Sequence, residues 1–159
     1  MTDEQFTRAF ERGEIPPADF DHRAHVRVAW VYLRESASLE AATARMRAAI
    51  QRFAAAANAS QKYHETITVL WMRLLADAAA RVRQPCELAD LLAACPELAD
   101  KDLPLKYYSR ERLFSDAARS GWIEPGQLHN AATPQRPINS QLPTPNAQAA
   151  SPKEDLPEN

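Results

Sequence analysis

The sequence predicts an all-α protein, for three reasons. Alanine and leucine are abundant, and the 159 residues include only 3 glycines. No segment alternates Val, Ile or Thr with polar residues, as a half-buried strand would. Apolar residues instead recur at helical spacing, and 45% of the chain is hydrophobic, which is enough for one core. We therefore expect a single-domain bundle of five to seven helices over residues 1–124.

Cap residues and apolar periodicity predict where the helices begin and end. Thr2 with Gln5 forms a capping-box pattern, and Gly13 is placed to end the first helix. Asp19 or Asp21 is placed to cap the second helix. The expected helices span residues 2–13, 22–35, 38–57, 64–83, 85–95 and 109–121.

The second expected helix lies within FDHRAHVRVAWVYL, residues 20–33, and carries two histidines on its apolar face. At 100° per residue, His22 and His25 share an arc with Val26 and Ala29. Such imidazoles need partners, because an unpaired buried polar group costs roughly 1–3 kcal/mol. The two histidines are three residues apart, so their Cβ atoms are about 5–6 Å apart, within reach of a single metal ion.

The segment KYHETIT supplies a third histidine at the start of the fourth expected helix. There His64 falls at the centre of the apolar face, close to Trp71 and Leu75. Together with His22 and His25, it would complete a three-histidine site that keeps open positions, as catalytic metal sites do. Zinc, iron, copper or nickel suits such ligands; zinc would support hydrolysis, and iron or copper oxygen chemistry.

Two other interpretations of the three histidines stay open. In the first, each is structural and hydrogen-bonded to a backbone carbonyl or to a neighbouring tyrosine, Tyr32 or Tyr63. In the second, a pocket holds an organic ligand such as a tetrapyrrole, with one histidine as its axial ligand.

Three further side chains are candidate catalytic groups. Glu65 is placed to act as a general base, as a fourth metal ligand, or as an acceptor that orients an imidazole. It equally suits a helix N-terminus with no further role. Tyr107 and Tyr108 precede the last expected helix, where they could bind an anionic group or donate protons. The alternative is that both tyrosines only pack.

Composition and pattern exclude several other functions. A formal net charge of −2 gives no general attraction to nucleic acid or to an anionic membrane. The charged N-terminus and the short apolar runs predict a cytoplasmic protein without a membrane span. On the helix expected over residues 85–95, the Cα atoms of Cys86 and Cys95 would be about 13 Å apart, too far for a disulfide. A small-molecule substrate or ligand is the expected partner, and the oligomeric state is left open.

The C-terminal residues 125–159 differ from the rest of the chain. They contain seven of its 12 prolines and no aromatic residue. Because such a segment buries too little apolar surface to offset the entropy of ordering it, we expect a disordered tail.

Four separated motifs, FDHRAHVRVAWVYL, KYHETIT, KYYS and SDAARSGWIEP, resemble those of a family of short bacterial all-helical proteins. That family carries FxHxxH(L/V)xxA(W/Y), YHET(I/L)T and YYS in the same order. The resemblance covers about residues 18–125, and it implies no activity. The long polar tail departs from the family pattern. The resemblance implies that six residues occur as one set: His22, His25, His64, Glu65, Tyr107 and Tyr108.

The sequence therefore predicts a small metal-dependent enzyme with a mononuclear three-histidine site, whose substrate is undetermined. The alternative is a non-catalytic helical binding or regulatory module with a buried histidine network.

Overall fold

The computed structural model describes residues 1–83 and 87–126, and all of their regular structure is helical. The prediction of an all-α bundle of five to seven helices is confirmed by seven α-helices in these ranges. They are α1 (Asp3–Glu11), α2 (His22–Glu35), α3 (Leu39–Ala56), α4 (Glu65–Arg81), α5 (Leu88–Ala94), α6 (Arg110–Leu113) and α7 (Asp116–Ser120). Short 3-10 helices span Pro17–Asp19, Ser60–Lys62, Pro96–Ala99 and Leu103–Lys106. Cys86, and the predicted tail from residue 127 onward, lie outside the described residues.

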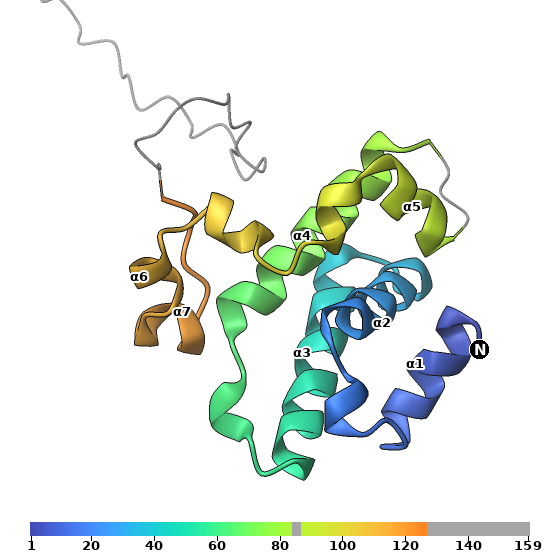
Figure 1. The fold of residues 1–159 in the computed structure, drawn as a ribbon, viewed down its shortest axis with the longest axis horizontal. Helices are drawn as coiled ribbons and strands as arrows, with labels where there is room; N and C mark the ends of the chain where they lie inside the picture. The colour runs from blue at the N-terminus through green and yellow to red at the C-terminus, as the bar shows by residue number, and fades with distance from the viewer. Residues whose placement is uncertain (84–86, 127–159) are drawn as a thin grey trace, which may run out of the picture.

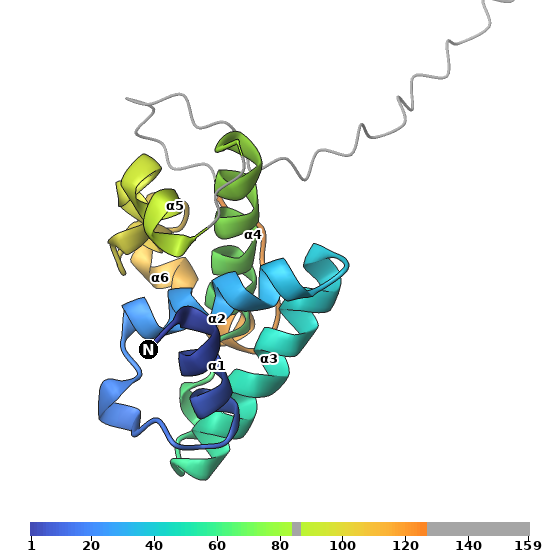
Figure 2. The same cartoon turned by 90° about the vertical axis from the view of Figure 1, so that its right-hand side faces the viewer.

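Helix α2 is central to the packing, since it contacts α1, α3 and α4 (Figures 1 and 2). Helices α6 and α7 lie beside the first half of α4, whereas α5 lies near its other end (Figure 1). The most deeply buried side chains include Val28 and Tyr32 of α2 and Leu70 and Leu75 of α4. The core thus runs along the α2–α4 contact.

Helix starts follow the predicted caps closely. Thr2 and Gln5 form a capping box, and Gly13, with φ of 74°, follows the end of α1. Asp21, rather than Asp19, caps α2 through a hydrogen bond from the backbone N–H of the first turn. These local signals therefore set where α1 and α2 begin.

The prediction of one continuous helix over residues 109–121 is wrong, because α6 and α7 are separate. Ser115 Oγ donates to the Arg112 carbonyl at 2.7 Å and accepts from the backbone N–H of Ala118. A serine that bonds backbone groups in this way competes with the helical ladder and starts a new helix. Phe114, at the break, is 48% exposed.

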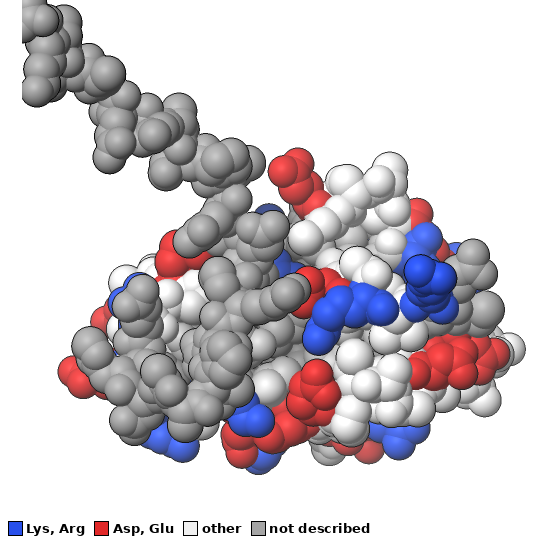
Figure 3. Space-filling view, turned by 90° about the horizontal axis from the view of Figure 1, so that it is seen from above, with Lys and Arg blue, Asp and Glu red and all other residues white. Residues whose placement is uncertain are grey.

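Figure 3 shows acidic and basic side chains interspersed over the face that it presents. Among the described helices, none combines the length and the apolar character that crossing a bilayer requires.

Candidate functional site: a histidine-lined cavity

A cavity of about 360 Å³ lies between α2, α3 and α4, and all three predicted metal-binding histidines line it. This volume is within the range of small-molecule sites. Its apolar walls are Phe20, Val26, Ala29, Met46, Ile50, Ile67, Trp71, Met72 and Leu75. Its polar lining is Asp21, His22, His25, Lys62, Tyr63, His64, Thr68 and Lys101.

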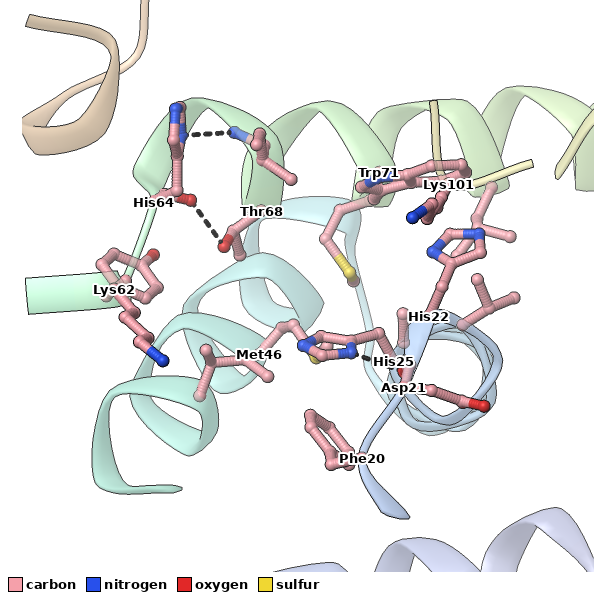
Figure 4. A pocket seen from close by; sticks show the side chains of 17 residues that line it. Phe20, Asp21, His22, His25, Met46, Lys62, His64, Thr68, Trp71 and Lys101 are labelled. Atoms are coloured by element: carbon pink, nitrogen blue, oxygen red, sulfur yellow. Dashed lines mark hydrogen bonds between the residues drawn. The ribbon is translucent and has the colours of Figure 1, made fainter. Parts of the chain in front are cut away.

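His22 is held at one end of the cavity by the chain beyond α5. Its Nε2 lies 3.0 Å from the Leu98 carbonyl oxygen, and its ring centre lies 4.5 Å from that of Trp71. Because a carbonyl only accepts, Nε2 carries the proton in this bond. Figure 4 shows His22 next to Trp71, at the end of the cavity where Lys101 also lies.

His25 is oriented by the backbone just before α2. Its Nδ1–H donates to the Asp21 carbonyl at 2.7 Å, and its ring packs 4.1 Å from that of Phe20. Burial lowers the pKa of His25, so the ring is neutral at pH 7. Its Nε2 is therefore an acceptor, and it has no hydrogen-bond partner among the described residues.

His64 lies outside α4, as its N-cap, and not on the apolar face of that helix as predicted. Its Nδ1 accepts from the Ile67 N–H at 3.1 Å, and its Nε2–H donates to the Leu113 carbonyl at 2.6 Å. The first N–H groups of a helix need acceptors, and here an imidazole provides one. Burial lowers the pKa of His64, in keeping with the neutral form that these bonds require. Figure 4 shows its ring directed away from His22 and His25.

The three histidines share a cavity but do not converge on one point. Each bonds a different backbone carbonyl, and His64 has no ring nitrogen left for a metal ion. In residues 1–83 and 87–126, no three His, Cys, Asp or Glu side chains are grouped closely enough to hold an ion. The arrangement therefore does not fit the predicted zinc, iron, copper or nickel centre of His22, His25 and His64.

Glu65 lies outside the cavity lining and is already paired. Arg47 Nε contacts both of its carboxylate oxygens, at 2.9 and 3.0 Å, and the Tyr63 hydroxyl donates to it as well. Burial would raise the pKa of Glu65, but the bonds from Arg47 and Tyr63 hold it below its ordinary value. The carboxylate thus stays charged and joins α3 to α4.

Tyr107 and Tyr108 also lie outside the cavity lining. Tyr108 is fully buried, and its hydroxyl donates to the Ile123 carbonyl at 2.7 Å. Burial raises the pKa of Tyr108 to about 12, so its proton remains in that bond. Tyr107 is half-buried and packs against the core.

The KYHETIT, KYYS and SDAARSGWIEP motifs meet at a junction between α4 and residues 108–124. Besides the bonds of His64 and Tyr108, Thr66 Oγ1 donates to the Gly121 carbonyl at 2.7 Å. The same oxygen accepts from the Ile123 N–H at 3.2 Å. These hydrogen bonds explain why the three motifs occur together in this sequence.

Among the charged residues that line the cavity, sequence reasoning missed Lys62 and Lys101. Both lie in short connections, which have no helical periodicity to reveal the face they occupy. Lys62 could have been noticed as the first residue of KYHETIT, two positions before His64. No sequence signal links Lys101 to the cavity.

These features define an all-α protein with a histidine-lined, mainly apolar cavity. No protein-family model, curated protein or solved structure matches the chain. The resemblance to a family of short bacterial helical proteins stays a prediction.

Proposed function

We propose that the chain is a small-molecule-binding helical module, which holds a mainly apolar ligand in the cavity between α2, α3 and α4. The observation that supports this proposal is a cavity of about 360 Å³ with apolar walls and a few polar groups. Ligand sites in proteins commonly combine these properties. Because a cavity of about 150 Å³ accepts benzene, this one has room for about a dozen non-hydrogen atoms.

His25 supplies the polar contact that would orient such a ligand. Its Nδ1 is held by the Asp21 carbonyl, so the ring cannot turn without losing that bond. Its neutral Nε2 accepts hydrogen bonds, and a ligand hydroxyl or N–H is the matching group. An oriented acceptor in an apolar cavity favours ligands that carry one donor.

The proposal is tested by titrating the full chain with 2-naphthol, 2-naphthamide and 2-naphthoate and measuring binding by calorimetry. Ala29→Leu adds bulk inside the cavity, and Ala44→Leu makes the same change at an exposed position of α3. We expect at least one probe to bind the native protein and the Ala44→Leu variant, with at least tenfold weaker binding to the Ala29→Leu variant. Circular dichroism checks that both variants stay helical. Binding of none of the three probes, or equal binding to both variants, would overturn the proposal.

A further inference from the structure

We infer that the ligand of this cavity is an apolar carboxylic acid, bound as its anion; this inference rests on the proposed function. The cavity is lined by two lysines, Lys62 and Lys101, and by a single carboxylate, Asp21. Asp21 Oδ1 is occupied by the Ala24 N–H at 2.9 Å, as the cap of α2. Figure 4 shows the Asp21 carboxylate pointing away from the histidines. The polar part of the lining therefore has an excess of positive charge.

Several arginines of the bundle have acidic partners, although others, such as Arg110, form no ion pair with a described residue. Arg27 pairs with Asp3, and Arg47 pairs with Glu65. By contrast, neither Lys62 nor Lys101 forms an ion pair with any residue in the described ranges. Both lysines are exposed. Two ammonium groups without counter-charges beside an apolar cavity attract anions.

The positions of the lysines fit an elongated molecule with a charged end. Figure 4 shows Lys101 at the Trp71 end of the cavity and Lys62 at the other end, with Met46 between them. A lysine places a point charge on a flexible stem, which suits a carboxylate at the mouth of a cavity. The ring or chain of the acid would then lie against the apolar walls. The carboxylate of the ligand would thus pair with the positive charge of a lysine, and its hydrocarbon body would fill the apolar cavity.

The test compares 2-naphthoate with its neutral analogue of similar size, 2-naphthamide, by calorimetry on the full chain. We expect naphthoate to bind at least tenfold more tightly at low salt, and added salt to reduce this preference. The lysine that holds the carboxylate is identified by Lys62→Ala and Lys101→Ala, of which at least one should remove most of the preference. Arg110→Ala is the control, because it removes one positive charge at an exposed position without a described ion pair.

Two results would overturn the inference and leave the proposed function standing. One is that naphthamide or naphthol binds as tightly as naphthoate and that the Ala29→Leu substitution weakens this binding, which places the neutral probe in the cavity. The other is that the preference for naphthoate persists in the double variant Lys62→Ala/Lys101→Ala. Failure of all three probes to bind would instead overturn the proposed function itself.

Discussion

The imidazole of His64 joins two segments far apart in the chain, since its Nε2–H donates to the Leu113 carbonyl at 2.6 Å. Its other nitrogen accepts from the Ile67 N–H in the first turn of α4. The two partners require one neutral tautomer, with the proton on Nε2. The ring therefore acts as a helix cap and as a tie to α6 at once.

Substitutions at His64 should separate these two roles. His64→Asn keeps a good N-cap but loses the bond to Leu113, and it should cost about 1–2 kcal/mol of unfolding free energy. His64→Ala loses both bonds and leaves a small cavity, and it should cost about 2–4 kcal/mol. Urea denaturation followed by circular dichroism measures both values. Equal costs for the two variants would contradict the capping role.

Stability should fall as the pH is lowered through the range where histidines titrate. Burial lowers the pKa of both His25 and His64 in the folded chain. The unfolded chain therefore binds more protons, and the contribution of these two histidines to the unfolding free energy is fully present above the ordinary histidine pKa of about 6.5. That contribution is lost as the pH falls through the lower pKa values of the folded state.

The pH dependence can be assigned to His64 by comparison with His64→Asn. Urea denaturation at about pH 7.5, 6.5 and 5.5 should show a shallower pH dependence for this variant than for the native chain. Glu65, whose pKa is held below its ordinary value by Arg47 and Tyr63, stays charged throughout this range and does not contribute. A slope unchanged by the substitution would show that His64 does not carry the effect.

The sequence predicted the helices well because their signals are local. Thr2 and Ser38 cap the helices that were expected to begin at these residues. Asp21, one of two predicted candidates, caps α2. The spacing of apolar residues placed α2, α3 and α4 correctly, because residues on the buried face of a helix recur about every 3.6 positions. The break at Ser115 was missed, since the apolar residues continue in register across it.

The site was harder to predict because its details depend on contacts distant in sequence. His22, His25 and His64 do line one cavity, but His64 does so as the N-cap of α4 and not from the apolar face on which helical periodicity placed it. Their orientations, however, are set by hydrogen bonds to backbone carbonyls, two of them supplied by Leu98 and Leu113. A carbonyl is present at every residue, so sequence alone cannot show which one an imidazole will meet.

The Glu65–Arg47 pair should contribute to stability and not to ligand binding. Glu65 is largely buried, Arg47 is partly exposed, and the contact involves both carboxylate oxygens. A double-mutant cycle with Glu65→Gln and Arg47→Gln should give a coupling free energy of about 1–2 kcal/mol. Affinity for 2-naphthoate should change by less than about twofold, because neither residue lines the cavity. A large loss of affinity in stably folded Glu65→Gln would contradict this assignment.

His25 should discriminate between ligands by their hydrogen-bond donors. A hydroxyl that reaches the neutral Nε2 gains one hydrogen bond, so 6-hydroxy-2-naphthoate should bind up to about tenfold more tightly than 2-naphthoate. In His25→Phe the ring size and the packing on Phe20 are largely kept, but the acceptor is lost. Calorimetry should then show no preference for the hydroxylated acid. If the native preference survives in the variant, the hydroxyl bonds another group.

The junction between α4 and the C-terminal segment should depend strongly on one hydroxyl. Thr66 Oγ1 donates to the Gly121 carbonyl and accepts from the Ile123 N–H, so Thr66→Val leaves two backbone groups without that partner. The expected loss of unfolding free energy is about 2–3 kcal/mol, because buried backbone groups without partners are costly. Thr7→Val is the matched control, since Thr7 is equally buried but bonds only the Asp3 carbonyl of its own helix. The helical N–H bond to that carbonyl persists, so the control should lose less than about 1 kcal/mol. Equal losses in the two valine variants, measured by urea denaturation, would show that burial of the hydroxyl matters and its junction bonds do not.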